Sequence, residues 1–208
     1  MIKPFEFYFD FASPYSYIAH KEIVKIEKRF QIKIIYMPIF LSGLHKFLGI
    51  TGPALIPSKA KFVIRDCKLL AEKYKINFRF NSYFPINSLN LMRGLLIAEK
   101  DNFAGLYINK IFDATWRDGL NLNDNSIVEK VLKNLNLNPK NFLIQITNQK
   151  IKEELINRTN DACDKGIFGT PSFFVNEAES KVGNKNELVG NKDELNDILD
   201  VIDEKFKP

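Results

Sequence analysis

The chain has 208 residues, of which 45% are hydrophobic, 26% charged and 12% aromatic. These proportions suit a folded domain with enough apolar material for a core, and they exclude a disordered tail, a collagen-like fibre and a small disulfide-stapled protein. Lys and Arg number 30 against 25 Asp and Glu, for a net charge of +5, but no run of five basic residues forms the clustered footprint of a nucleic-acid-binding surface.

The first forty residues predict a strand, a helix and a second strand. Phenylalanines at 5, 7 and 9 alternate with Glu6, Tyr8 and Asp10, which indicates a β-strand. Ser13 followed by a proline is a typical helix start, and apolar residues continue at helical spacing through residues 14–30. A second strand is predicted from residue 32 to 37, and a strand–helix–strand unit of this kind normally carries a parallel pair.

From about residue 40 to residue 165 the chain has helical patterns. Glycines and prolines between 43 and 57 predict a loop, and a short candidate strand lies at 76–80. Helices are predicted at 59–74, 88–100, 103–118, 124–135, from 139 onward, and at 148–165.

Strand patterns return at 172–175 and at about 187–189, and a final helix is predicted after residues 190–191. The order is therefore β-α-β, a long helical block, then β-β-α. This order predicts an α/β fold with a thioredoxin-like core, formed by residues 1–40 and 166–208 and interrupted by a large all-helical insertion, residues 41–165.

The turn after the first strand is the reactive position of such a core. Redox members carry C-x-x-C there, because the helix dipole and its free N–H groups stabilise a thiolate. Here residues 13–16 are Ser-Pro-Tyr-Ser, so dithiol–disulfide exchange through this turn is excluded, and Cys67 and Cys163 lie elsewhere, in predicted helices. Ser13 has two interpretations: it caps its helix, or its hydroxyl donates to a thiolate that another molecule brings to this anion-attracting helix start.

A second candidate position is Thr170-Pro171, directly before the third strand. In thioredoxin-like folds a proline at this place, opposite the first helix, is often cis and exposes the backbone of the preceding residue for pairing with an extended peptide. The alternative is an ordinary turn proline at the first residue of a strand.

Several segments together carry a family resemblance: residues 7–17 with their two serines, the Gly52-Pro53 loop with Lys59, residues 87–89 with Arg93, residues 114–116, and residues 166–171. They resemble the 2-hydroxychromene-2-carboxylate isomerases, the glutathione-dependent branch of the DsbA-like proteins, which is close to the kappa-class glutathione transferases. The resemblance runs from about residue 5 to about residue 200.

The resemblance implies a glutathione site. Ser13 would activate the thiol, Thr170 beside Pro171 would pair with the cysteinyl backbone, and Lys59 would reach the glycyl carboxylate or an acidic substrate, unless it is a solvated surface lysine. The γ-glutamyl end would meet the turn at Gly190, Asn191 and Lys192, where the lysine stands in place of an acidic residue of the family.

The resemblance also places three side chains in a substrate cleft. His45 falls where the isomerases carry a lysine, and Asn87 and Arg93 would line the cleft between core and insertion. A helix cap is the alternative for Asn87 and a salt bridge for Arg93. Ile50 stands where a kappa-class asparagine is expected.

These features predict a glutathione-dependent isomerase that acts on an apolar or aromatic carboxylic acid or enone by transient thiolate addition. The alternatives are a kappa-class-like glutathione transferase and a DsbA-like binding module without redox chemistry. No stretch approaches the ~20 apolar residues of a membrane span, and the first residues lack a signal-peptide pattern. We therefore expect a cytoplasmic protein with a small-molecule substrate and no metal, membrane or nucleic-acid partner, and the resemblance implies a homodimer.

Overall fold

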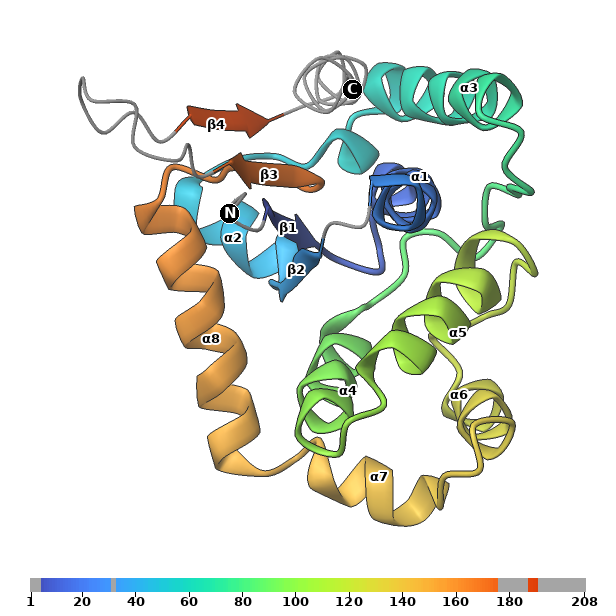
Figure 1. The fold of residues 1–208 in the computed structure, drawn as a ribbon, viewed down its shortest axis with the longest axis vertical. Coiled ribbons are helices and arrows are strands. Elements are labelled where there is room, and N and C mark those ends of the chain that lie inside the picture. Colours follow the sequence, from blue (N-terminus) through green and yellow to red (C-terminus); the bar gives the residue numbers. More distant parts are fainter. Residues whose placement is uncertain (1–4, 31–32, 176–186, 191–208) are drawn as a thin grey trace.

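Four strands form one mixed sheet in the order β2-β1-β3-β4 (Figure 1). The computed structural model describes residues 5–30, 33–175 and 187–190. Strand β1 (Phe5–Phe9) is parallel to β2 (Ile34–Pro38) and antiparallel to β3 (Ser172–Val175), which is antiparallel to β4 (Glu187–Gly190). Helix α1 (Pro14–Phe30) connects the parallel pair, as predicted, whereas the final predicted helix lies outside the described residues.

Strand β1 pairs with β2 on one edge and with β3 on the other, and both of its faces are buried. On one face Phe7 stacks on Phe9 and on Phe173 of β3, with ring centroids 5.2 and 5.1 Å apart. On the other face Tyr8 packs in a smaller cluster with Ile39. The alternating pattern therefore marks a strand that is covered on both sides rather than half-exposed.

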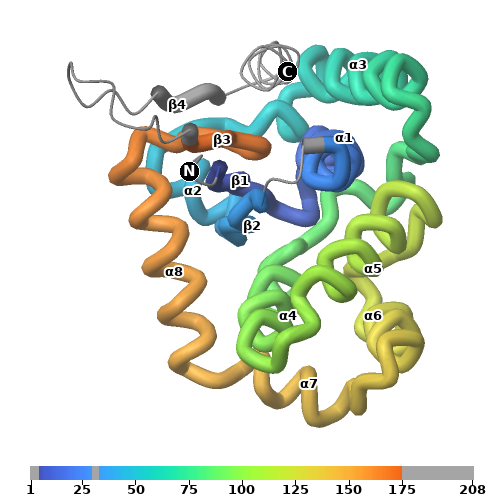
Figure 2. The backbone as a smooth tube through the Cα atoms, viewed as in Figure 1, coloured from blue at the N-terminus to red at the C-terminus, as the bar shows by residue number. Residues whose placement is uncertain are grey.

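The chain leaves the sheet after β2, passes through a series of helices and returns at β3 (Figure 2). These elements are α2 (Leu41–Leu48), the 3-10 helix η1 (Pro53–Leu55), α3 (Pro57–Lys73), α4 (Leu89–Lys100), α5 (Ala104–Trp116), α6 (Asn125–Lys133), α7 (Pro139–Gln145) and α8 (Gln149–Asp164). The helical block between the second and third strands is thus as predicted. Its division from the core at residues 40/41 and 165/166 stays a prediction.

The predicted loop from residue 43 to residue 57 is wrong, because α2 and η1 occupy much of it. Two glycines of this stretch do not interrupt α2: Gly43 lies within the helix and Gly49 ends it. Gly49 ends α2 with φ 67°, a left-handed conformation that favours glycine. Gly43 lies under the ring of Phe40, where a Cβ would stand 2.8 Å from Cδ1.

The candidate strand at 76–80 is also wrong, since this segment joins no sheet. Arg79 instead donates its backbone N–H to the carbonyl of Trp116 (2.6 Å). Phe78 and Phe80 pack on the Trp116 ring, at centroid distances of 6.1 and 5.6 Å. The apolar alternation that resembles a strand comes from an extended segment laid against α5.

One hydrophobic cluster extends from the sheet into the helical block. Phe11, just after β1, lies 5.6 Å from Phe9 and 4.9 Å from Phe112 of α5, measured between ring centroids. Trp116 donates its indole N–H to the Phe11 carbonyl (2.8 Å). The segment that follows β1 is therefore anchored to α5.

In the part of the chain that the structure describes, no helix is long and apolar enough to cross a membrane.

Helix α1 carries a buried histidine whose two ring nitrogens both have partners. His20 is 2% exposed, its Nδ1 lies 2.9 Å from the Tyr36 hydroxyl, and its Nε2 lies 2.9 Å from Oδ1 of Asn109. The amide oxygen can only accept, so Nε2 carries the proton and Nδ1 accepts from Tyr36. Burial lowers the pKa of His20 to about 4, which keeps the ring neutral.

We expect His20 to make the free energy of unfolding depend on pH. Between pH 6.5 and 4 the unfolded chain binds a proton on this ring and the folded chain does not, so stability falls as the pH falls, by about 2 kcal/mol between pH 7.5 and 5. In His20→Gln that component is absent. Urea unfolding of both proteins at the two pH values measures it, and a wild-type-minus-variant difference that is constant with pH would contradict the prediction.

Candidate active site

Ser13 lies between β1 and α1 and is 4% exposed. Its Oγ accepts the backbone N–H of Ser16 (3.2 Å), and its carbonyl accepts from Tyr17 (3.2 Å), so it caps α1 as predicted. Its hydroxyl also donates to the carbonyl of Thr170 (3.0 Å), 157 residues away. Ser13 therefore joins the start of α1 to the segment before β3.

Thr170 and Pro171 lead into β3, and the bond between them is cis, as expected from the position. The Thr170 hydroxyl is buried and finds no hydrogen-bond partner among the described residues. The Cα of Gly169 faces open space, since no atom of the described residues comes within 4 Å of the position a Cβ would take there. Gly190 pairs with Ser172 across β3 and β4, which places its backbone near this end of β3. Asn191 and Lys192 lie outside the described residues.

The buried side chain of Asp10 accepts hydrogen bonds that hold the turn after β1 in place. This carboxylate is fully buried and accepts the backbone N–H groups of Ala12 (2.8 Å) and Leu41 (2.8 Å). Its carbonyl accepts from the backbone of Ser13 (3.0 Å). Burial raises the pKa of Asp10, and the two backbone N–H groups oppose that rise. One side chain thus connects the turn after β1 to the start of α2.

Lys59 and Ile50 are both exposed. Lys59 lies in the first turn of α3, and α3 is connected to the start of α1 by a hydrogen bond from the Tyr15 hydroxyl to Asp66 (2.9 Å). Ile50 follows α2. The predicted roles of both residues toward glutathione stay predictions.

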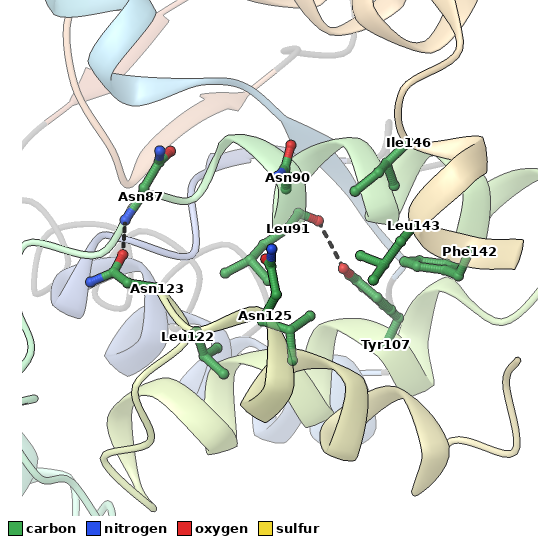
Figure 3. A pocket seen from close by; sticks show the side chains of 11 residues that line it. Asn87, Asn90, Leu91, Tyr107, Leu122, Asn123, Asn125, Phe142, Leu143 and Ile146 are labelled. Carbon is green, nitrogen blue, oxygen red and sulfur yellow. Dashed lines mark hydrogen bonds between the residues drawn. The ribbon is translucent and has the colours of Figure 1, made fainter. Parts of the chain in front are cut away.

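Two of the three residues expected in a substrate cleft line different pockets, and their role toward a substrate stays a prediction. Asn87 is one of the residues that line a pocket of about 230 Å³ between α4, α5, α6 and α7 (Figure 3). Arg93 lines another, of about 360 Å³, between α2, α4 and α8. The His45 ring lies against Gly52, where a Cβ would stand 3.1 Å from Nδ1, and burial lowers the pKa of this histidine.

The structure also supports the alternative interpretation of Asn87, in which it caps a helix. Its Oδ1 accepts the backbone N–H of Leu89 (3.2 Å) at the start of α4, and its own N–H donates to Oδ1 of Asn123 (2.8 Å), a bond visible in Figure 3. Arg93, by contrast, makes no salt bridge within the described residues. A helix-start role for Asn87 is supported, and a salt-bridge role for Arg93 is not.

The chain matches the DSBA-like thioredoxin domain over residues 5–196. It belongs to the DsbA-like family. It is 28% identical over 174 residues to a 2-hydroxychromene-2-carboxylate isomerase of Pseudomonas sp. (strain C18), covering 83% of this chain and 81% of that protein. It is 26% identical over 217 residues to glutathione S-transferase kappa 2 of Caenorhabditis elegans, covering 99% and 94%. The resemblance seen in the sequence is confirmed.

Solved structures agree on the fold of this DsbA-like protein. A crystallised 2-hydroxychromene-2-carboxylate isomerase matches with a TM-score of 0.78 at 23% identity, over 98% of this chain and 94% of the other. The α-DsbA1 of Wolbachia pipientis matches with a TM-score of 0.61 at 17% identity, over 97% and 84%. These likenesses confirm the thioredoxin-like fold with its helical block.

Sequence reasoning missed Asp10, although one signal was present. A carboxylate that directly follows alternating buried aromatics, three residues before a helix cap, is placed where the sheet ends and cannot easily reach water. Its partner at Leu41 could not be foreseen, because α2 was not expected to begin there.

Replacing the Asp10 carboxylate by an amide should destabilise the DsbA-like fold. In Asp10→Asn only one oxygen remains for two N–H donors, and a buried donor without a partner costs about 1–3 kcal/mol. Asp124→Asn is the matched control, because Asp124 accepts the N–H of Ser126 at the exposed start of α6 (2.8 Å) and Asn caps equally well. Urea unfolding measures both, and equal stabilities for the two variants would refute the role of Asp10.

Proposed function

We propose that this protein is a glutathione-dependent isomerase, similar to 2-hydroxychromene-2-carboxylate isomerase, that acts on an apolar or aromatic carboxylic acid or enone. The observation that carries the proposal is the contact between the Ser13 hydroxyl and the Thr170 carbonyl (3.0 Å). It puts a hydroxyl donor at the helix start where a redox relative would hold a cysteine. Support also comes from the relatives named as isomerases and glutathione transferases.

The residues present fit a thiol-bearing peptide. The start of α1 offers the positive end of a helix dipole, which favours a thiolate. The buried Thr170 hydroxyl without a partner among the described residues and the open space at Gly169 leave polar capacity and room beside Ser13. Glutathione, when bound, would supply the nucleophilic sulfur that residues 13–16 lack.

The Ser13 hydroxyl can donate to a different acceptor while it continues to cap α1. A rotation about Cβ–Oγ turns the hydrogen from the Thr170 carbonyl toward a thiolate, while the same oxygen continues to accept from Ser16 (3.2 Å). The Thr170 carbonyl is then free to accept a backbone N–H of a bound peptide. The hydroxyl would thus stabilise the sulfur anion and release a pairing site in one movement.

The remaining contacts belong to the same proposal. Lys59 would meet the glycyl carboxylate, and Pro171 would keep the Thr170 backbone turned toward the ligand. The γ-glutamyl end would lie toward Gly190, Asn191 and Lys192. We propose a homodimer as the assembly, by analogy with the family resemblance.

A kappa-class-like glutathione transferase is the second candidate, because relatives of that name match up to 99% of this chain. Counting free thiol over many turnovers of 2-hydroxychromene-2-carboxylate separates the two activities. An isomerase regenerates glutathione at each turnover, and a transferase consumes one per product. A chain that binds no glutathione would instead be a binding module without redox chemistry.

Ser13→Ala should raise the apparent pKa of bound glutathione. Loss of one charge-assisted hydrogen bond is worth roughly 1.5–3 kcal/mol, or about one to two pKa units. Ultraviolet absorbance of the thiolate, followed against pH at saturating glutathione, measures the shift.

Ser16→Ala is the matched control for this measurement. The Ser16 hydroxyl is buried without a partner among the described residues, while its backbone N–H, which bonds Ser13, is kept. We expect a much smaller shift in this variant. An unchanged thiol pKa in Ser13→Ala would reduce Ser13 to a helix cap and remove the basis of the proposal.

A further inference from the structure

One side-chain hydrogen bond joins the Ser13 turn to helix α3. Tyr15, two residues after Ser13, donates its hydroxyl to Oδ2 of Asp66 (2.9 Å), 51 residues away in the chain. Both side chains belong to half-buried residues, so water competes less for this bond than at an open surface. Burial raises the pKa of the Tyr15 phenol, and the neighbouring Cys67 and Asp66 act in the same direction, so the phenol stays a donor.

A second hydrogen bond connects the same two helices further along. Nζ of Lys25 in α1 donates to the carbonyl of Tyr74, directly after the last residue of α3 (3.1 Å). Helix α3 is therefore held against α1 at two separate points. Of these two bonds, the one from Tyr15 to Asp66 lies beside Ser13.

Lys59 lies on the same side of α3 as Asp66. Seven residues separate them, which is almost two turns and about 10 Å along the helix, so their Cα–Cβ directions differ by only about 20° around the axis. Lys59 is exposed and lies in the first turn of α3, which contains no acidic residue. In Figure 1 this first turn lies toward η1 and the sheet, and the later turns lead away from both. The direction in which Lys59 points thus depends on how α3 is held at Asp66.

We propose that Tyr15 is a positioning residue for the glycyl end of glutathione: by holding Asp66, it fixes the orientation of α3 in which Lys59 meets the glycyl carboxylate. The inference rests on the proposed function and adds to it a residue that touches neither the sulfur nor the carboxylate. It gives the turn at residues 13–16 two tasks. Ser13 acts on the thiol directly, and Tyr15 acts on the far end of the ligand through α3.

The test compares glutathione with its glycyl ethyl ester, which has no charge on that carboxyl group, by calorimetric titration of the whole chain. Wild type should bind glutathione about 3- to 5-fold more tightly than the ester, as expected for one exposed ion pair. Tyr15→Phe removes only the hydroxyl and should lose most of this preference, as should Lys59→Gln. The pKa of the bound thiol should keep its wild-type value in Tyr15→Phe, because Ser13 is unchanged.

Further variants separate positioning from general damage to the fold. Asp66→Asn keeps an oxygen that accepts from Tyr15 and should retain the preference for glutathione, whereas Asp66→Ala should lose it. In the double variant Tyr15→Phe/Lys59→Gln the two losses should not add, because both act on the same contact. Tyr83→Phe is the matched control, since Tyr83 is 52% exposed and lies outside α1 and α3, and it should bind both ligands as wild type does.

Three results would overturn the inference while leaving the glutathione site in place. They are equal binding of glutathione and its ester by wild type, an unchanged preference in Tyr15→Phe, and an equal weakening of both ligands in Tyr15→Phe. Full additivity in the double variant would also contradict it. Failure of the proposed function looks different, because wild type would then bind neither ligand, and the inference would fail with it.

Discussion

The structure depends on how one buried carboxylate is satisfied. Asp10 ends the central strand inside the protein, where an unpaired charge would be very costly, and backbone donors from two separate segments compensate it. These donors fix the turn that carries Ser13 and the first residue of α2. The start of α1, the end of β1 and the helical block are consequently held in one arrangement.

The same arrangement is compatible with serine in place of cysteine at the start of α1. A helix start attracts an anion whatever residue caps it, and Ser13 supplies both the cap and a hydroxyl donor directed at Thr170. A redox relative must carry its own thiolate in this position. This chain keeps the positive helix end and the facing strand segment, which suits a thiol brought by a second molecule.

The sequence predicted the parts of the fold that local patterns determine. Alternating aromatics located β1, the Ser-Pro pair located α1, and the position of Thr170-Pro171 before β3 indicated its cis bond. It failed where tertiary packing assigns a residue's role. Gly43 and Gly49 suggested a loop although they belong to α2 or end it, and the apolar alternation at 76–80 suggested a strand although Phe78 and Phe80 pack on Trp116.

The central claim is that the start of α1 and the segment before β3 form one binding site for a thiol-bearing peptide. Titrating glutathione into the ¹⁵N-labelled protein and following assigned amide resonances tests it most directly. The account predicts that the largest shifts fall at Ser16, Tyr17, Thr170 and Ser172, and that S-methylglutathione, which cannot form a thiolate, loses those at Ser16 and Tyr17. Shifts confined to other surfaces, or no shifts at millimolar glutathione, would contradict it.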